Sequence, residues 1–97
     1  MTTVFVVLRD YMGDHHAHPE FESVWWNREE AREECLRLAE EEMTRSTGYI
    51  LRLRVTDSVV RIEHKLTGGT WADRTLFFAK PVGIRGSAVM ALASLVR

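Results

Sequence analysis

The densest group of side chains able to do chemistry lies between residues 10 and 21, where three histidines stand close to acids. Imidazole and carboxylate groups are ligands for Zn²⁺, Ni²⁺ and Cu²⁺. The residues are His15, His16 and His18, with Asp14 and Glu20 beside them. Ligands so close in sequence need a dedicated turn to converge on one ion, and no spaced cysteine pair completes a set. A solvated loop without cofactor is the favoured interpretation, with a metal site or a histidine pH switch as alternatives.

Nucleophilic or acid–base catalysis needs a nucleophile beside a base, or two carboxylates in different environments. The single cysteine, Cys35, falls inside a predicted helix beside Glu33 and Glu34, which raise the pKa of a neighbouring thiol. That placement is typical of a small core residue. Gly68 and Gly69 lack the lysine and following helix of a phosphate loop, and predict a hairpin turn instead. The sequence gives no reason to expect an enzyme.

Cations at alternating positions of two predicted strands favour a binding surface. They are Arg52, Arg54, Arg61 and Lys65, which we expect on one face of a sheet. With Tyr49 or Trp71 nearby, such a face suits nucleic-acid phosphates and stacked bases. An isoelectric point near 6.4 and interspersed acids weaken that interpretation. An acidic protein partner and an ordinary solvated face are the alternatives.

Two apolar features favour association with another chain. Trp25 and Trp26 are adjacent on a predicted strand, so their side chains point to opposite faces, and only one can enter the core. An exposed tryptophan is enriched at protein interfaces. Residues 88–96 are almost wholly apolar, without the polar arc of a surface helix. A homodimer is therefore the leading expectation for assembly.

Size and charge bound the class of protein. The 97 residues are 45% hydrophobic, which fits one globular domain over 1–97. Neither a signal peptide nor a run of roughly 18 apolar residues is evident, so a cytoplasmic protein without membrane contact is expected. Residues 1–42 carry a net charge of −7 and residues 43–97 a net charge of +6. This asymmetry either forms two charged sides or vanishes through interleaving.

Periodicity predicts the elements that position these residues. Strands are expected at 3–9, 22–26, 49–55, 59–66 and 70–79, where β-branched and aromatic residues alternate between turn signals. Asn27 is a preferred N-cap, and a helix over 27–43 buries a stripe of apolar residues: Ala31, Cys35, Leu38 and Ala39. Its glutamates, Glu34 included, are expected to face water. A short apolar helix over 88–96 follows Ser87 as its cap.

The predicted fold class is therefore α+β, in the order β-β-α-β-β-β-α. Two layers are expected: a mostly antiparallel sheet of four or five strands, with the long acidic amphipathic helix on one face. The first strand is expected inside the sheet, because it is apolar on both faces. Pro81, Gly83 and Gly86 are expected to end the last strand near Ala79.

Residues 4–7, 21–31 and 49–53 form a strand, a strand leading into a capped helix start, and a returning strand. This arrangement, over residues 3–55, resembles a loose family of small bacteriophage and actinobacterial proteins of uncharacterised function. The resemblance implies a phage-type accessory protein and carries over no functional residues. We expect a non-enzymatic protein that docks on a host or partner protein through Trp25 or Trp26, the four cations and the C-terminal helix. A nucleic-acid-binding protein using the same cations is the alternative.

Overall fold

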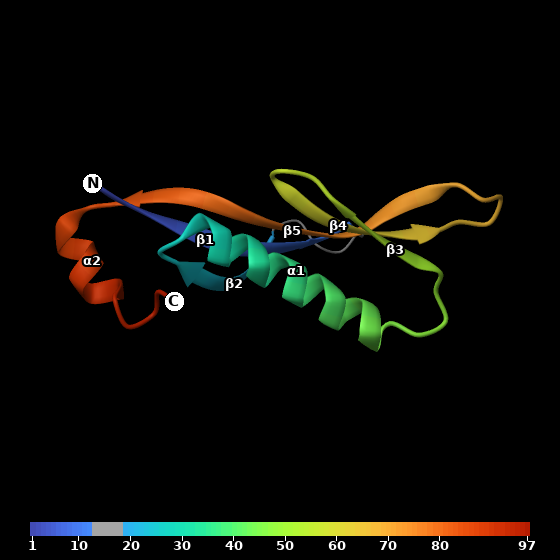
Figure 1. The fold of residues 1–97 in the computed structure, drawn as a ribbon, viewed down its shortest axis with the longest axis horizontal. Helices are drawn as coiled ribbons and strands as arrows, with labels where there is room; N and C mark the ends of the chain where they lie inside the picture. The colour runs from blue at the N-terminus through green and yellow to red at the C-terminus, as the bar shows by residue number, and fades with distance from the viewer. Residues whose placement is uncertain (13–18) are drawn as a thin grey trace.

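The computed structural model describes residues 1–12 and 19–97, and within them five antiparallel strands form one sheet (Figure 1). The strand order across the sheet is β2-β1-β5-β4-β3. The elements are β1 (Thr2–Tyr11), β2 (Glu20–Trp25), α1 (Arg28–Arg45), β3 (Leu51–Val55), β4 (Val59–Lys65), β5 (Trp71–Ile84) and α2 (Gly86–Leu92). The α+β class and the element order predicted from the sequence are confirmed, and β1 lies inside the sheet between β2 and β5.

Helix α1 begins where the sequence predicts it. The Asn27 side-chain oxygen accepts hydrogen bonds from the backbone N–H groups of Glu29, at 2.7 Å, and Glu30, at 3.2 Å. These bonds satisfy donors that have no partner inside the helix. The predicted stripe of Ala31, Cys35, Leu38 and Ala39 is buried. The asparagine thus fixes the start of α1, and the stripe fixes which side faces the sheet.

The expectation that Glu34 faces water is wrong. Its side chain is buried and is held by Arg37, which donates from both Nε and Nη2, while Arg97 approaches from the C-terminus at 3.9 Å. A buried carboxylate is tolerated when cations and hydrogen bonds compensate its lost hydration. The C-terminal residue that supplies part of this compensation is too distant in sequence to be read from the helical pattern.

Helix α1 packs on one face of the sheet, which we call the inner face. Inner-face residues come from the middle strands and form the core with the α1 stripe: Val7, Val60, Ile62 and Phe77. The opposite face, which we call the outer face, is not covered by α1. Because side chains alternate along a strand, every neighbour of an inner-face residue in sequence belongs to the outer face.

The last strand and the second helix differ from the sequence prediction. Strand β5 does not end near Ala79 but continues through Pro81 to Ile84. Pro81 pairs with Phe5 of β1 and lies beyond the last β4 partner, Phe78, so on that side β5 is an edge that tolerates a proline. Helix α2 starts at Gly86 behind Arg85, which makes no side-chain cap hydrogen bond, and ends at Leu92. The expected span of 88–96 and the Ser87 cap are therefore wrong.

The molecule is elongated, with extents of 53 × 25 × 22 Å and a radius of gyration of 15.3 Å, whereas about 13 Å is usual for this length. Helix α2 lies at one end, beyond the start of α1 (Figure 1). From there the chain returns to the edge of β2, where the Arg97 N–H donates to the Val24 carbonyl at 2.7 Å and the Arg97 carbonyl accepts from Trp26 at 2.9 Å. This tail closes part of an edge that is otherwise open to pairing.

Replacing the N-cap tests the origin of α1. Asn27→Ala should lower the free energy of unfolding by about 1 kcal/mol, because two helix N–H groups lose their acceptor. For a domain of this size that corresponds to a melting temperature roughly 4–8 °C lower. Thermal unfolding followed by circular dichroism measures the shift. Glu40→Ala, at an exposed position of the same helix, is the control and should change little; equal melting of Asn27→Ala and wild type would contradict the assignment.

Candidate functional site

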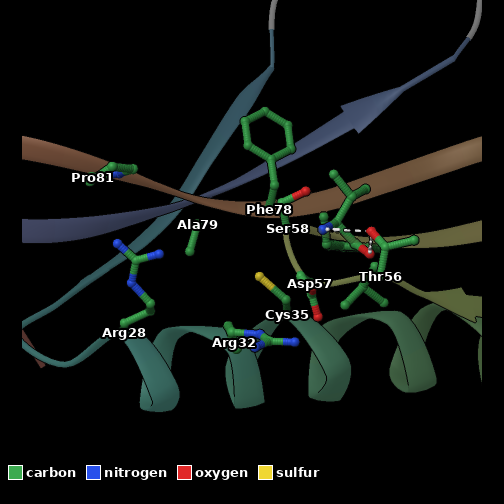
Figure 2. A pocket seen from close by; sticks show the side chains of 12 residues that line it. Arg28, Arg32, Cys35, Thr56, Asp57, Ser58, Phe78, Ala79 and Pro81 are labelled. Carbon is green, nitrogen blue, oxygen red and sulfur yellow. Dashed lines mark hydrogen bonds between the residues drawn. The ribbon is translucent and has the colours of Figure 1, made fainter.

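The outer face carries a row of apolar side chains that crosses four strands. Backbone register places Phe21 of β2 opposite Leu8 of β1, Leu8 opposite Phe78 of β5, and Phe78 opposite Val59 of β4. We call these four residues the apolar row. Figure 2 shows Phe78 pointing away from α1, whereas Ala79 and Cys35 point toward each other between the layers. Phe21 is 63% exposed, so part of the row is open to water.

Two further rows flank the apolar row along the strands. On one side Val24, Val6 and Lys80 stand in register, and on the other side Asp10, Leu76 and Arg61 do. The apolar patch therefore extends to Val6 and Leu76, and it ends at a lysine on one side and at an aspartate on the other. An apolar patch rimmed by polar residues is the usual appearance of an interaction site.

The predicted cations lie at the β3–β4 end of the same outer face. Arg54 pairs directly with Arg61 across β3 and β4, and Arg52 pairs with Glu63. Lys65 follows Glu63 by two residues and so shares its face. We call Arg52, Arg54, Arg61 and Lys65 the cationic cluster. The structure brings all four to one surface.

Glu63 stands at the centre of the cationic cluster and neutralises part of its charge. Its carboxylate is buried, accepts a hydrogen bond from Arg52 Nε at 3.0 Å and lies 3.6 Å from Arg54 Nε. Arg61 is 3.7 Å from Asp73. The hydrogen bond from Arg52, followed by the positive charges of Arg52, Arg54 and Arg61, lowers the pKa of the Glu63 carboxyl. The cluster therefore keeps a net positive charge that is well below the sum of its four cations.

Trp25 is the last residue of β2, and Trp26 follows it outside the strand, so the expectation that both tryptophans lie on one strand is wrong for Trp26. Trp25 packs against the core and donates from Nε1 to Ser23 Oγ at 2.7 Å. Trp26 is 40% exposed, and its backbone N–H is held by the C-terminal residue. Of the two, Trp26 is the residue available to a partner. Helix α2 adds Met90, which is 83% exposed, at the same end of the molecule.

Cys35 lines a cavity of about 180 Å³ between α1, the β3–β4 turn and β5 (Figure 2). The wall toward the helix contains Arg28 and Arg32, and the far wall is the turn at 56–58. Burial, and next to it the negative charge of Glu34, raises the pKa of the Cys35 thiol to about 11. At neutral pH the thiol is protonated and is a poor nucleophile. The sequence interpretation of Cys35 as a core residue agrees with its burial.

A buried polar cluster under the C-terminal part of α1 was not predicted from the sequence. Arg9 points to the inner face, donates to the Tyr11 hydroxyl at 2.9 Å, and lies 3.2 Å from Glu22 and 3.9 Å from Glu42. Among the described residues, Glu42 Oε2 and His64 Nδ1 are buried without a hydrogen-bond partner. Strand alternation could have predicted this cluster. Arg9 lies two residues after the buried Val7, and His64 lies two residues after the buried Ile62, so both point to the inner face.

The histidine group singled out by the sequence, His15, His16 and His18, lies outside the described residues. In the part of the chain that the structure describes, no three histidine, cysteine, aspartate or glutamate side chains gather closely enough to hold a metal ion. Within the same part, no helix combines the length and the apolar character needed to cross a membrane.

Comparisons with family models, with curated proteins and with solved structures return no match to this chain. The resemblance of residues 3–55 to small phage proteins therefore stays a prediction.

Glu63→Gln tests the ionic centre of the cationic cluster. The pKa of the Glu63 carboxyl is lowered in the folded chain. Its contribution to the free energy of unfolding is therefore present above the unfolded-state pKa of about 4.3, and it is lost as pH falls through the folded-state pKa. The variant should be less stable than wild type at pH 7, and the difference should shrink in acid. Urea midpoints across this pH range measure it. Asp57→Asn in the exposed turn is the control; a pH-independent difference for Glu63→Gln would refute the assignment.

The Cys35 thiol gives a second test. With its pKa near 11, about one molecule in a thousand carries the thiolate at pH 8, so labelling by a disulfide reagent should be slow in the folded chain. The rate should rise steeply with pH and reach that of a free thiol in urea. Rapid stoichiometric labelling of the native chain at pH 8 would show that the thiol is accessible and ionised, contrary to the structure.

Proposed function

We propose that this chain is a non-enzymatic, phage-type accessory protein that docks on an acidic surface of a partner protein through its cationic cluster. The observation that supports the proposal most strongly is the unequal neutralisation of the four cations. Arg52 is committed to Glu63, and Arg61 to Asp73. Arg54 is about half exposed and, at 3.6 Å, shares the Glu63 carboxylate with Arg52, and Lys65 forms no ion pair among the described residues.

Arg54, whose carboxylate partner is shared with Arg52, and Lys65 thus present incompletely neutralised positive charge on strands that are already ordered. Arg52 and Glu63 fix the strands beneath them, so little side-chain freedom is lost when a partner carboxylate arrives. Preorganisation of this kind reduces the entropic cost of binding. A guanidinium with unused donors accepts a carboxylate in bidentate geometry, which favours an aspartate or glutamate of a protein.

Nucleic-acid binding, the alternative use of the cluster, is less well supported. The Arg52 guanidinium lies 4.2 Å from the centre of the Trp71 ring and so covers one face of the aromatic surface on which a base would stack. Glu63 and Asp73 place negative charge among the cations, which repels a phosphate backbone. Carboxylates of a protein can be placed between such charges individually, whereas phosphates follow a fixed spacing along a strand.

Charge reversal at Arg54 and Lys65 tests the proposal. The double variant Arg54→Glu/Lys65→Glu should bind the partner at least about tenfold more weakly than wild type, because attraction becomes repulsion. The immobilised chain would be exposed to host extract, retained proteins identified by mass spectrometry, and the affinity of each purified candidate measured by calorimetry at low and high salt.

Arg45→Glu/Arg85→Glu carries the same net charge at positions away from the cluster and is the matched control. Binding that the control retains, that the double variant loses and that weakens with salt supports the proposal. Equal binding by both variants, or retention that disappears on nuclease treatment, would contradict it; the second result would favour the nucleic-acid alternative.

A further inference from the structure

The outer face leaves an apolar surface that α1 does not cover. The apolar row, with Val6 and Leu76 beside it, lies on the two central strands of the sheet and their neighbours. In a two-layer fold the second face of a sheet is usually polar, with apolar side chains confined to the covered face. Here apolar residues occupy both faces of β1 and β5, as in a sheet that is covered twice.

The total exposed area of the chain is larger than that of a compact monomer of the same mass. The chain exposes 6507 Å², whereas a compact monomer of 11.2 kDa is expected to expose about 5,700 Å². The excess is about 800 Å², which is the area each partner buries in a protein interface of standard size. The elongated shape of the molecule also contributes to this excess, and the outer face supplies part of it.

Two charges make the uncovered surface complementary to itself. Lys80 stands in register with Val6, and Asp10 in register with Leu76, so they lie on opposite sides of the apolar row. Among the described residues neither Lys80 nor Asp10 forms an ion pair, unlike Arg61 and Glu63 on the same face. Val6 and Asp10 are four residues apart on one strand, which corresponds to about 13 Å.

A two-fold axis along the apolar row uses these charges. Such an axis, lying between two facing sheets, places each residue of the row against its own copy and exchanges the two flanking rows. The row with Lys80 in one copy then faces the row of Asp10, Leu76 and Arg61 in the other. Arg61 is already paired with Asp73, whereas Asp10 has no ion pair among the described residues. Lys80 of one copy and Asp10 of the other are offset by one strand, a distance that the long lysine side chain spans. The two-fold symmetry forms this contact twice.

We infer that the outer face binds a second copy of this chain, with the apolar row on the two-fold axis and Lys80 of each copy paired with Asp10 of the other. The sheets then pack face to face at about 10 Å, with α1 of each copy on the outside. Strand β4 begins at Val59, so β3 and β4 have no counterpart on the Lys80 side of the row. Arg54 and Lys65 therefore stay accessible, and the inference does not depend on the proposed function.

A charge-exchange experiment tests this dimer. Wild type should have a solution mass twice 11.2 kDa by light scattering at micromolar concentrations. Asp10→Lys and Lys80→Glu should each weaken dimerisation by at least about tenfold, because both symmetric contacts become repulsive. An equimolar mixture of the two variants should recover the dimer, since each copy then offers the charges that the other lacks. Lys65→Glu, a cation of the same face away from the row, should remain dimeric.

The outcomes separate cleanly. Loss of the dimer in each variant alone with recovery in the mixture supports the inference, and recovery also shows that both variants fold. A wild-type chain that stays monomeric, variants that stay dimeric, or a mixture that stays monomeric would each overturn it. If Asp10→Lys and Lys80→Glu change the solution mass but leave binding of the acidic partner protein unchanged, the dimer interface is separate from the cationic cluster.

Discussion

One helix of 18 residues has to provide the second layer for a sheet of five strands, and the rest of the structure follows from that shortage. A helix of this length spans about 27 Å and covers one face only. The inner face therefore receives the α1 stripe, with Ala31 and Cys35 small enough to bring the helix close to Phe77. The outer face keeps apolar side chains on β1 and β5 without a layer of its own. The proposed dimer supplies that missing layer.

The electrostatics follow from the same arrangement. The sequence halves carry −7 and +6, but β1 from the acidic half lies beside β5 from the basic half, so the two charges interleave within the sheet. On α1, Arg37 and Arg45 offset Glu34 and Glu41. On the outer face, Glu63 offsets the arginines around it. On the outer face, incompletely neutralised positive charge is left at Arg54 and Lys65.

The sequence predicted what depends on local interactions. Asn27 at the start of α1, the buried helical stripe and the alternation that brings Arg52 and Arg54 to one face all depend on residues close in the chain. It missed what depends on distant partners. Pro81 is tolerated because the β4 pairing stops at Phe78, and the buried Glu34 receives part of its charge compensation from Arg97 at the C-terminus. In both cases the residues responsible are far away in the sequence.

The candidate site also combines features that local sequence predicts with features that depend on strand pairing. The placement of the cationic cluster followed from strand alternation, but its neutralisation by Glu63 needed the register of β3 against β4. The apolar row could not be found without the pairing of β1 with β5, since Leu8 and Phe78 are 70 residues apart. Neither strand alone reveals this surface, which forms only because β1 and β5 are neighbours in the sheet.

Isotope-filtered nuclear Overhauser spectroscopy can detect whether the outer face of one copy packs against the outer face of another across a two-fold axis. A dimer prepared from one labelled and one unlabelled copy reports only contacts between copies. We expect cross-peaks among the side chains of Leu8 and Phe78 from different copies, because these residues lie on the proposed axis. Intermolecular cross-peaks confined to other surfaces, such as Trp26 and α2, with none from the apolar row, would contradict it.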